Sequence, residues 1–515
     1  MHETAATWLM TTLTSSTLLV ALMQTATSLP VLFLAMPAGA LADVVDRRRL
    51  LIVTQGWMLV AATLLGGLTL TGLVTPDRLL FLTFVLGLGS ALNTPAWQAT
   101  VQDLVPRDEV LDAVSLNGVS TNIARAIGPA IGGLLVASIG SGAVFLLNAL
   151  SFCAVIGVLG RWRSVPRENV LPAERVAGAI RAGIRYLRHA PAAQAVFIRT
   201  AAFTLFASAL WALLPVLARR ELGLGALGYG TLLGSLGLGA VAGVPILPRI
   251  RARIRTDRLV VLGTLVFAGA TAVLAGSRRV PVLCAALVVA GLAWITVMPA
   301  FNVATQRVAP DWVRARMLAV YVLMFQGGLA LGSACWGIVA ARAGVRTALL
   351  AAAIGMVVAA VATWRYPLAP GETLDLSPSG HWRDPVVTGT LDTDDGPVLV
   401  MVEYRVAPGQ QADFIRAMDA LATVRRRDGA MTWGLYRDTA DPGRMLETFL
   451  SESWGEHLRQ HARATVADRA VEAVARRFHD GPGLPAVSHL IYASTPRAAD
   501  DRREVARRLD SDEVA

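Results

Sequence analysis

Residues Gly39 to Leu50, GALADVVDRRRL, separate two long apolar stretches of the chain. The segment begins with small and apolar residues. It then places Asp43, Asp46 and three consecutive arginines, Arg47–Arg49, in a short polar turn. Short arginine-rich connections between membrane-spanning helices are retained on the cytoplasmic side of the membrane. The segment therefore predicts a polytopic membrane protein with this turn in the cytoplasm.

The amino-acid composition supports that interpretation. Hydrophobic residues make up 54% of the chain, charged residues 16%, and the mean hydropathy is +0.53, whereas soluble domains carry about 25% charged residues. A net charge of +10 can indicate a nucleic-acid partner. Here most arginines lie in short connections between apolar stretches, so membrane topology explains them. We expect the lipid bilayer, and no nucleic acid, as a partner.

Eleven stretches are long and apolar enough to cross a bilayer, which takes about 20 residues. A shorter apolar segment, Thr4–Leu13, precedes them. We expect it to be either the end of a first helix whose start is missing from this chain, or a re-entrant or interfacial segment. The predicted spans are residues 17–42, 50–73, 79–98, 113–139, 143–159, 195–218, 227–248, 259–275, 281–301, 317–341 and 348–364.

Arginines are distributed unequally between the two sides of these spans. The connections on the side of Arg47 contain 19 arginines, and those on the other side contain 7. Because basic residues stay in the cytoplasm, the arginine-rich side should be cytoplasmic in a multi-pass protein of the cell inner membrane. The polar C-terminal region should then be cytoplasmic too.

The chain contains an internal repeat. With a shift of 204 residues, the fourth and fifth helices of the first half align without a gap on the corresponding helices of the second half. Repeats of this kind are found in membrane transporters built from two related halves, whose substrate path lies between the halves near the middle of the membrane. The aligned identities are Gly87/Gly291, Pro95/Pro299, Ala96/Ala300, Gln102/Gln306, Pro106/Pro310, Gly128/Gly332, Gly133/Gly337 and Gly140/Gly344.

The repeat and the composition divide the chain into six segments. Residues 161–194 should be a cytoplasmic linker, because Val176, Ile180 and Ile184 share one face of a helix whose other face carries arginines. Residues 496–515 should be a disordered charged tail. The other expected segments are an N-terminal transmembrane half (1–160) with an incomplete first helix, a C-terminal transmembrane half (195–366), a polar linker (367–396) and a folded cytoplasmic domain (397–495).

The span over 113–139 contains the sequence AIGPAIGG, with Gly128, Pro129, Gly132 and Gly133. Small residues allow two helix backbones to approach closely, and proline removes a helical hydrogen bond. We expect these residues to form a helix-packing pivot between the halves, although generic close packing would give the same pattern.

Three polar side chains within the predicted spans are candidates for a substrate path. Arg125 and Asn122 lie in the span over 113–139, and Asn93 lies in the preceding one. Charged groups inside a membrane are costly and usually face a polar cavity. Alternatively, Arg125 lies near a helix end and reaches the lipid headgroups.

These motifs resemble those of a known transporter family. Segment 39–50 is similar to the loop between the second and third helices of the major facilitator superfamily, in which Gly39, Asp43, Arg47 and Arg48 would gate the path. AIGPAIGG resembles the exporter motif of that superfamily, with Ala124 where a glycine is expected. With the TPAWQA passage and the soluble tail, the chain resembles the transmembrane secretion effector subfamily, which includes enterobactin-exporter-like proteins. The resemblance implies a major facilitator fold.

The region after Trp364 should contain a soluble α+β domain. Its pattern of strands and helices, β-α-β-β-α-α-β over 398–494, favours a ferredoxin-like fold. It resembles antibiotic-biosynthesis-monooxygenase-like domains, which implies dimerisation through the sheet. His457 and His461 are four residues apart and share a helix face. No further ligand at a convincing spacing completes a metal site, so we expect no metal, no cofactor and no catalytic residue.

The function that these features favour is export, not enzyme catalysis. We expect an inner-membrane transporter that moves small molecules, siderophore-like or hydrophobic and drug-like, out of the cell by alternating access, driven by protons. No acidic residue lies centrally in a predicted full span, so the sequence does not identify the proton relay. Two alternatives remain open: a membrane-anchored enzyme whose C-terminal domain acts on an aromatic metabolite, and a sensor that transports nothing.

Overall fold

The computed structural model describes residues 1–103, 109–161, 176–368, 374–382, 385–387, 389 and 391–493. The chain divides into two units. One unit contains the membrane helices. The other contains the C-terminal sheet domain together with two short segments from the membrane half of the sequence, Ala177–Pro191 and Ala309–Val313.

The helices of the membrane unit follow the predicted spans. Among the described residues, ten helices are long and apolar enough to cross a membrane. One of them lies in α5, which contains two predicted spans because the chain turns sharply at Gly140. The helices are α1 (His2–Leu13), α2 (Thr17–Val44), α3 (Arg47–Leu70), α4 (Pro76–Asp103), α5 (Val110–Arg161), α7 (Pro191–Val216), a π-helical turn (Leu217–Glu221), α8 (Ala226–Gly243), α9 (Leu247–Arg253), α10 (Thr256–Gly276), α11 (Val280–Arg307), α12 (Asp311–Ala343) and α13 (Val345–Ala362).

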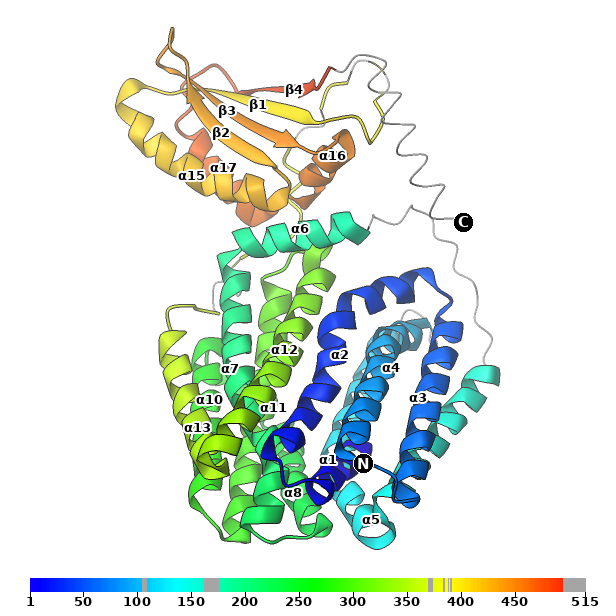
Figure 1. The fold of residues 1–515 in the computed structure, drawn as a ribbon. Coiled ribbons are helices and arrows are strands. Elements are labelled where there is room, and N and C mark those ends of the chain that lie inside the picture. The colour runs from blue at the N-terminus through cyan, green and yellow to red at the C-terminus, as the bar shows by residue number, and fades with distance from the viewer. Residues whose placement is uncertain are drawn as a thin grey trace. The chain divides into compact units, whose positions relative to one another are not determined.

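The membrane unit consists of two helix bundles that come from the two halves of its sequence (Figure 1). Contacts between the bundles repeat in a symmetric way. A Cβ added to Gly133 on α5 would lie 2.6 Å from the Cα of Gly230 on α8. A Cβ added to Gly337 on α12 would lie 2.6 Å from the Cβ of Ala21 on α2. Since Gly133 and Gly337 are partners in the sequence repeat, the repeat corresponds to equivalent helix crossings.

The C-terminal domain has the predicted order of elements and the predicted ferredoxin-like fold. Its four strands form one antiparallel sheet in the order β2-β3-β1-β4. The helices of the domain cover one face of this sheet (Figure 1). The elements are β1 (Val398–Arg405), a short 3-10 turn (Pro408–Gln410), α15 (Gln411–Asp428), β2 (Thr432–Arg437), β3 (Arg444–Ser451), α16 (Trp454–Arg463), α17 (Val466–Arg476) and β4 (Ala486–Ile491).

The sequence of β1 explains which face the helices cover. Val398, Val400, Val402 and Tyr404 alternate with more polar or larger residues and are buried, as expected for a strand with one face against a core. They pack with Phe414, Met418 and Leu421 of α15 and with Phe449 of β3.

The helix α17 begins with a capping box, in which the side chains of Thr465 and Asp468 bond each other's backbone.

Helix α6 (Val176–His189) forms within the predicted linker. Ala182 and Tyr186 on this helix are buried, whereas Arg181 is exposed. The buried face is not the predicted one, because Ile184 is 42% exposed, while the burial of Val176 and Ile180 lies outside the described part of the chain. The buried residues of α6 pack within the unit that contains the C-terminal domain.

Candidate functional site

The predicted gating loop is the connection between α2 and α3. Its residue Asp46 caps α3, because its Oδ1 accepts a hydrogen bond of 2.8 Å from the backbone N–H of Arg49. Asp is a favourable N-cap residue, which explains an acid at this position. Gly39 and Asp43 belong to the last turns of α2, and their surroundings lie outside what the structure describes.

Arg48 links the same loop to the end of α5. Its Nε donates to the carbonyl oxygen of Leu159 at 2.8 Å, and its Nη2 donates to that of Gly160 at 2.7 Å. The last carbonyl groups of a helix have no partner within the helix, and a guanidinium fork can satisfy two of them at once. Arg48 therefore fastens the loop to the end of the predicted span over 143–159, a role that the sequence analysis did not assign. Its neighbour Arg47 is half-buried.

The four residues of the predicted pivot lie on α5. Gly133 faces Gly230 of α8, and a Cβ on Gly230 would in turn lie 3.3 Å from the carbonyl oxygen of Pro129. Gly132 faces the start of the chain, and a Cβ added to Gly132 would lie 2.9 Å from the Cα of Met1. Gly128 has looser surroundings, with its nearest atom at 3.8 Å. Close approach between the two halves thus depends mainly on Gly133.

The predicted substrate-path residues are only partly described. Asn93 on α4 accepts hydrogen bonds at its Oδ1 from Thr54 Oγ1 at 3.1 Å and from Gln55 Nε2 at 3.3 Å, both on α3. Polar bonds of this kind join neighbouring membrane helices. Asn122 and Arg125 belong to α5, but their side chains lie outside the described part of the chain. Their role in a path stays a prediction.

An aromatic cluster lies in the C-terminal bundle, and the sequence analysis did not predict it. Trp294, in the middle of α11, has its ring 5.5 Å from that of Trp211, 5.9 Å from that of Phe203 and 6.1 Å from that of Phe325. Trp294, Trp211 and Phe325 are only half-buried. The Nε1 of Trp211 is buried without a hydrogen-bond partner among the described residues. A hydrogen-bonding ligand group would satisfy that donor.

An ion pair between a buried arginine and a half-buried aspartate also lies in the C-terminal bundle. Arg199 of α7, whose side chain is 5% exposed, donates to Asp257 Oδ1 of α10 at 2.7 Å. The same carboxylate accepts from the backbone N–H of Leu368 at 2.8 Å, after α13. Burying an unpaired charge costs several kcal/mol, so this pair holds three segments of the bundle together. Arg199 is separated from Asp257 by 58 residues, and nothing in the local sequence indicates that they pair.

The core of the C-terminal domain contains a buried polar network. Glu447 of β3 is fully buried and accepts hydrogen bonds from Arg425 Nε and Trp433 Nε1, each at 3.0 Å. Arg425 also lies 3.7 Å from Glu472, which accepts from the indole Nε1 of Trp382 at 2.8 Å. Trp382 belongs to the predicted linker 367–396. Part of that linker therefore packs against the domain.

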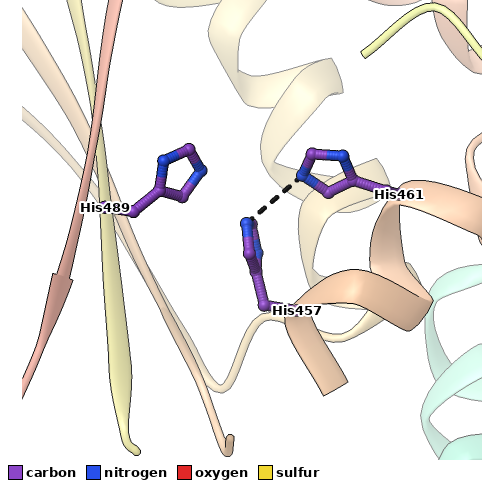
Figure 2. A group of neighbouring side chains, drawn as sticks. All are labelled: His457, His461 and His489. Atoms are coloured by element: carbon purple, nitrogen blue, oxygen red, sulfur yellow. Dashed lines mark hydrogen bonds between the residues drawn. The ribbon is translucent and has the colours of Figure 1, made fainter. Parts of the chain in front are cut away.

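Three histidines of the C-terminal domain lie together (Figure 2). His457 and His461 come from α16, and His489 comes from β4. The ring of His457 lies 4.7 Å from that of His461 and 4.8 Å from that of His489. Burial, with a smaller contribution from the charge of the other two rings, lowers the pKa of His457 to about 3, so its imidazole is neutral. The sequence analysis had identified His457 and His461 but missed His489.

The C-terminal domain also contacts α6 and the start of α12 within its own unit. Arg185 of α6 pairs with Glu456 of α16 at 3.0 Å. The guanidinium of Arg463 lies over the indole of Trp312, with its Cζ 4.5 Å from the ring centroid. The rings of Trp312 and Tyr186 meet edge-on, with their centroids 5.7 Å apart. A cation over an indole ring is attracted by the ring's quadrupole. These contacts join the C-terminal domain to α6, which follows the N-terminal half in sequence, and to the start of α12.

Comparisons with known proteins identify the family. Residues 1–497 match the family model described as transmembrane secretion effector. The chain is 26% identical over 378 residues to the multidrug efflux pump Tap of Mycolicibacterium fortuitum, which covers 69% of this chain and 88% of the pump. It is 36% identical over 131 residues to the staphyloferrin A transporter of Staphylococcus aureus, which covers 25% of this chain and 32% of that transporter. The second match thus spans about a third of the transporter's length.

Solved structures share the fold of the membrane unit. A D-xylose-proton symporter has a TM-score of 0.59 and 14% sequence identity to this chain. The superposition covers 72% of this chain and 96% of the symporter. Another similar structure is a bacterial homologue of the human lysosomal transporter Spinster in an inward-facing and occupied conformation. Its TM-score is 0.56 and its sequence identity 16%, and the superposition covers 71% of this chain and 93% of the homologue. The likeness of the C-terminal domain to monooxygenase-like domains stays a prediction. From the family match over almost the whole sequence, the chain belongs to the transmembrane secretion effector family of the major facilitator transporters.

Proposed function

We propose that this protein exports small molecules, siderophore-like or hydrophobic and drug-like, out of the cell by alternating access. Its family and the names of its relatives, a multidrug efflux pump and a staphyloferrin A transporter, support this proposal. The exporter-like motif at Gly128–Gly133 supports the outward direction. Within the C-terminal bundle, the half-buried aromatic rings around Trp294 offer apolar contact to a substrate.

The observation that carries the proposal is the pair of equivalent glycine contacts between the halves, Gly133 to Gly230 and Gly337 to Ala21. Two bundles that meet through small residues can rock against each other, because few interlocking side chains have to separate. Rocking of two halves around a site between them is the general mechanism of alternating access. The GPAIGG motif then acts as the pivot that the sequence predicts.

The test is efflux of fluorescent dyes and of a labelled siderophore from cells that express the protein. We expect Gly133→Ala to reduce efflux strongly, because the added methyl would lie 2.6 Å from the backbone of Gly230. Gly157→Ala, in the part of α5 after the turn at Gly140, is the matched control, since a Cβ there has no atom within 4 Å. Both variants are compared at equal amounts in the membrane. Equal efflux by Gly133→Ala and Gly157→Ala would overturn the pivot, and no efflux from any form of the folded protein would overturn export.

We further propose that protons drive the transport, with Asp43 in the gating loop contributing to the cycle. The resemblance of segment 39–50 to the gating loop of the superfamily supports this assignment. Efflux should collapse when a protonophore is added, and Asp43→Asn should reduce efflux while leaving the amount of protein in the membrane unchanged. Efflux that continues unchanged in the presence of a protonophore would contradict proton coupling.

We also propose that the protein lies in the cell inner membrane with its C-terminal domain in the cytoplasm. The excess of arginines on the side of Arg47 supports this orientation. A fluorescent reporter that matures only in the cytoplasm, fused after residue 515, should be bright. A dark reporter, with a periplasmic enzyme reporter active at the same position, would reverse the topology.

Finally, we propose that the protein dimerises through the C-terminal sheet. On the face that the helices leave uncovered, Leu399 of β1 is paired with Leu450 of β3 on one side and Leu490 of β4 on the other. Leu490 is 47% exposed and the other two leucines are half-buried. This apolar row supports a contact with a second copy of the same face, since apolar surface patches commonly mark interfaces. Leu450→Arg should convert a dimer into a monomer in light scattering of the purified protein. Unchanged mass, or a monomeric wild type, would contradict the proposal.

A further inference from the structure

The structure assigns a transition-metal site to the C-terminal domain, with His457, His461 and His489 as ligands (Figure 2). One ligating atom from each of these side chains lies within 4.8 Å of the corresponding atoms of the other two. His457 is 1% exposed, and the other two histidines are half-buried. This inference does not rest on the exporter function, because it concerns the soluble domain alone.

The spacing of the first two ligands fits a bound ion. Nε2 of His457 and Nε2 of His461 are 3.2 Å apart. In a tetrahedral site with metal–nitrogen bonds of about 2.0–2.1 Å, neighbouring ligand nitrogens are about 3.3–3.4 Å apart. The side chain of His489 would have to bring its nitrogen closer by roughly 1.5 Å, which rotation about its broad χ2 torsion allows. Three imidazoles leave one position of a tetrahedral site for water.

The hydrogen bonding of His457 is consistent with the same conclusion. The Nδ1 of His457 is buried and has no hydrogen-bond partner among the described residues, although buried polar atoms are almost always satisfied. An ion bound through Nδ1 would satisfy this atom directly, whereas an ion bound through Nε2 would leave Nδ1 as the N–H of the ring.

The fold holds these rings in place independently of any ion. His489 occupies a fixed register on β4, opposite Val400 of β1. Trp454 packs against His457 at 5.6 Å and edge-on to His489 at 6.2 Å. Trp382 packs edge-on to His461 at 4.8 Å. An aromatic shell of this kind excludes water and fixes ring orientation, as the surroundings of metal ligands generally do.

The ligand set selects the class of metal. Three imidazole nitrogens suit Zn²⁺, Cu²⁺, Ni²⁺ or Fe²⁺, whereas Mg²⁺ and Ca²⁺ prefer oxygen ligands. The positive charge of Arg425 opposes a cation nearby, but this guanidinium is paired with Glu447 at 3.0 Å and lies 3.7 Å from Glu472. We therefore infer a site for a divalent transition metal that ties α16 to β4.

The test uses the full-length protein in detergent, purified with an affinity tag that contains no histidine and stripped with a chelator. Zn²⁺ should bind with a stoichiometry of one per chain and raise the melting temperature, whereas Mg²⁺ should do neither. Co²⁺ should give the intense visible bands of a four-coordinate nitrogen site. His489→Gln and His461→Gln should each weaken Zn²⁺ binding at least about tenfold and abolish those bands.

The matched control is His479→Gln, which changes a histidine of the same domain that lies outside the cluster and accepts a hydrogen bond from the backbone N–H of Arg405. It should bind Zn²⁺ like the wild type. Circular dichroism establishes that all variants are folded. The inference is overturned if the wild type binds no saturable equivalent of Zn²⁺, Cu²⁺, Ni²⁺ or Fe²⁺. Binding that His489→Gln and His461→Gln leave unchanged would equally overturn it. In either case the three rings are only a hydrogen-bonded, packed cluster.

Discussion

Gly140 and Gly344, which are partners in the sequence repeat, adopt nearly the same left-handed backbone conformation. Gly140 has φ 80° and ψ 163°, and Gly344 has φ 87° and ψ 155°. Each lies at the turn between the last two membrane helices of its half. In this region of φ and ψ a side chain collides with the backbone, so that the conformation is almost restricted to glycine. The repeat thus preserves a turn geometry as well as a hydrophobic pattern.

The first prediction concerns these two turns. Gly140→Ala and Gly344→Ala should each destabilise the protein by about 1–3 kcal/mol, the usual cost of this backbone conformation for a residue with a Cβ. No atom lies within 4 Å of a Cβ added at either position, so the loss comes from the backbone and not from a clash. The melting temperature in detergent measures it. Gly269→Ala, an open glycine inside α10, should be neutral or slightly stabilising, and equal losses at all three positions would contradict the explanation.

The second prediction tests the role of Arg48 in the gating loop. Arg48→Lys keeps the positive charge but cannot donate in a fork to the carbonyl groups of Leu159 and Gly160. Losing a hydrogen bond from a charged donor costs about 1.5–3 kcal/mol, so efflux should fall about tenfold or more. Arg49→Lys is the matched control, because Arg49 is adjacent to Arg48, carries the same charge and is exposed. If both variants transport equally well, the loop acts through charge alone.

The third prediction concerns the aromatic cluster. Trp294→Ala removes ring contacts with Trp211, Phe203 and Phe325, each worth about 0.5–1.5 kcal/mol. Efflux of aromatic dyes should drop about tenfold at an unchanged level of protein in the membrane. Trp57→Ala is the control, because Trp57 is 50% exposed and lies on α3, in the other half. Wild-type efflux of every dye by Trp294→Ala would remove this cluster from the substrate path.

The fourth prediction is a pH dependence of the C-terminal domain. Burial alone would raise the pKa of Glu472, but the hydrogen bond from His381 and the charges of Arg425 and Arg476 outweigh it and hold this pKa below its usual value. A lowered pKa means that the carboxylate adds stability above about pH 4.5, and that this stability is lost as the pH falls. Melting temperature against pH should therefore decline steeply on acidification.

Glu472→Gln should lower the stability near pH 7 by about 3 kcal/mol, because it breaks a buried ion pair, and should flatten the acidic decline. Asp413→Asn, at an exposed pair with Arg416, should change little. Asp428 acts with the opposite sign: burial raises its pKa to about 6, so the stability it adds below pH 4 is lost as the pH rises through 6. An acidic decline that Glu472→Gln leaves unaltered would refute the assignment.

Several features of this protein could be predicted from the sequence because they depend on local pattern. Apolar stretches long enough to cross a bilayer predicted the membrane helices, and the strand-like segment that begins at Val398 predicted β1. The shift of 204 residues identified Gly140 with Gly344 and Gly133 with Gly337. Each of these signals is contained in a few consecutive residues, or in two copies of one segment.

Other features were decided only by the tertiary structure, since they join residues that are distant in sequence. Arg199 and Asp257 pair across 58 residues, and Arg48 reaches the carbonyl of Leu159 across 111. No periodicity specifies which charge meets which partner. That depends on how the helices cross.

The histidine cluster illustrates the same limit. The helical spacing of His457 and His461 placed both on one face of α16, but a pair of imidazoles alone does not complete a metal site. The third ring comes from β4, because the antiparallel register of that strand against β1 sets His489 beside Val400, on the face that α16 covers. The sequence determined the helix and the strand. Only the packing of one on the other brought the three rings together, because side-chain proximity between elements is fixed by the sheet order and not by local pattern.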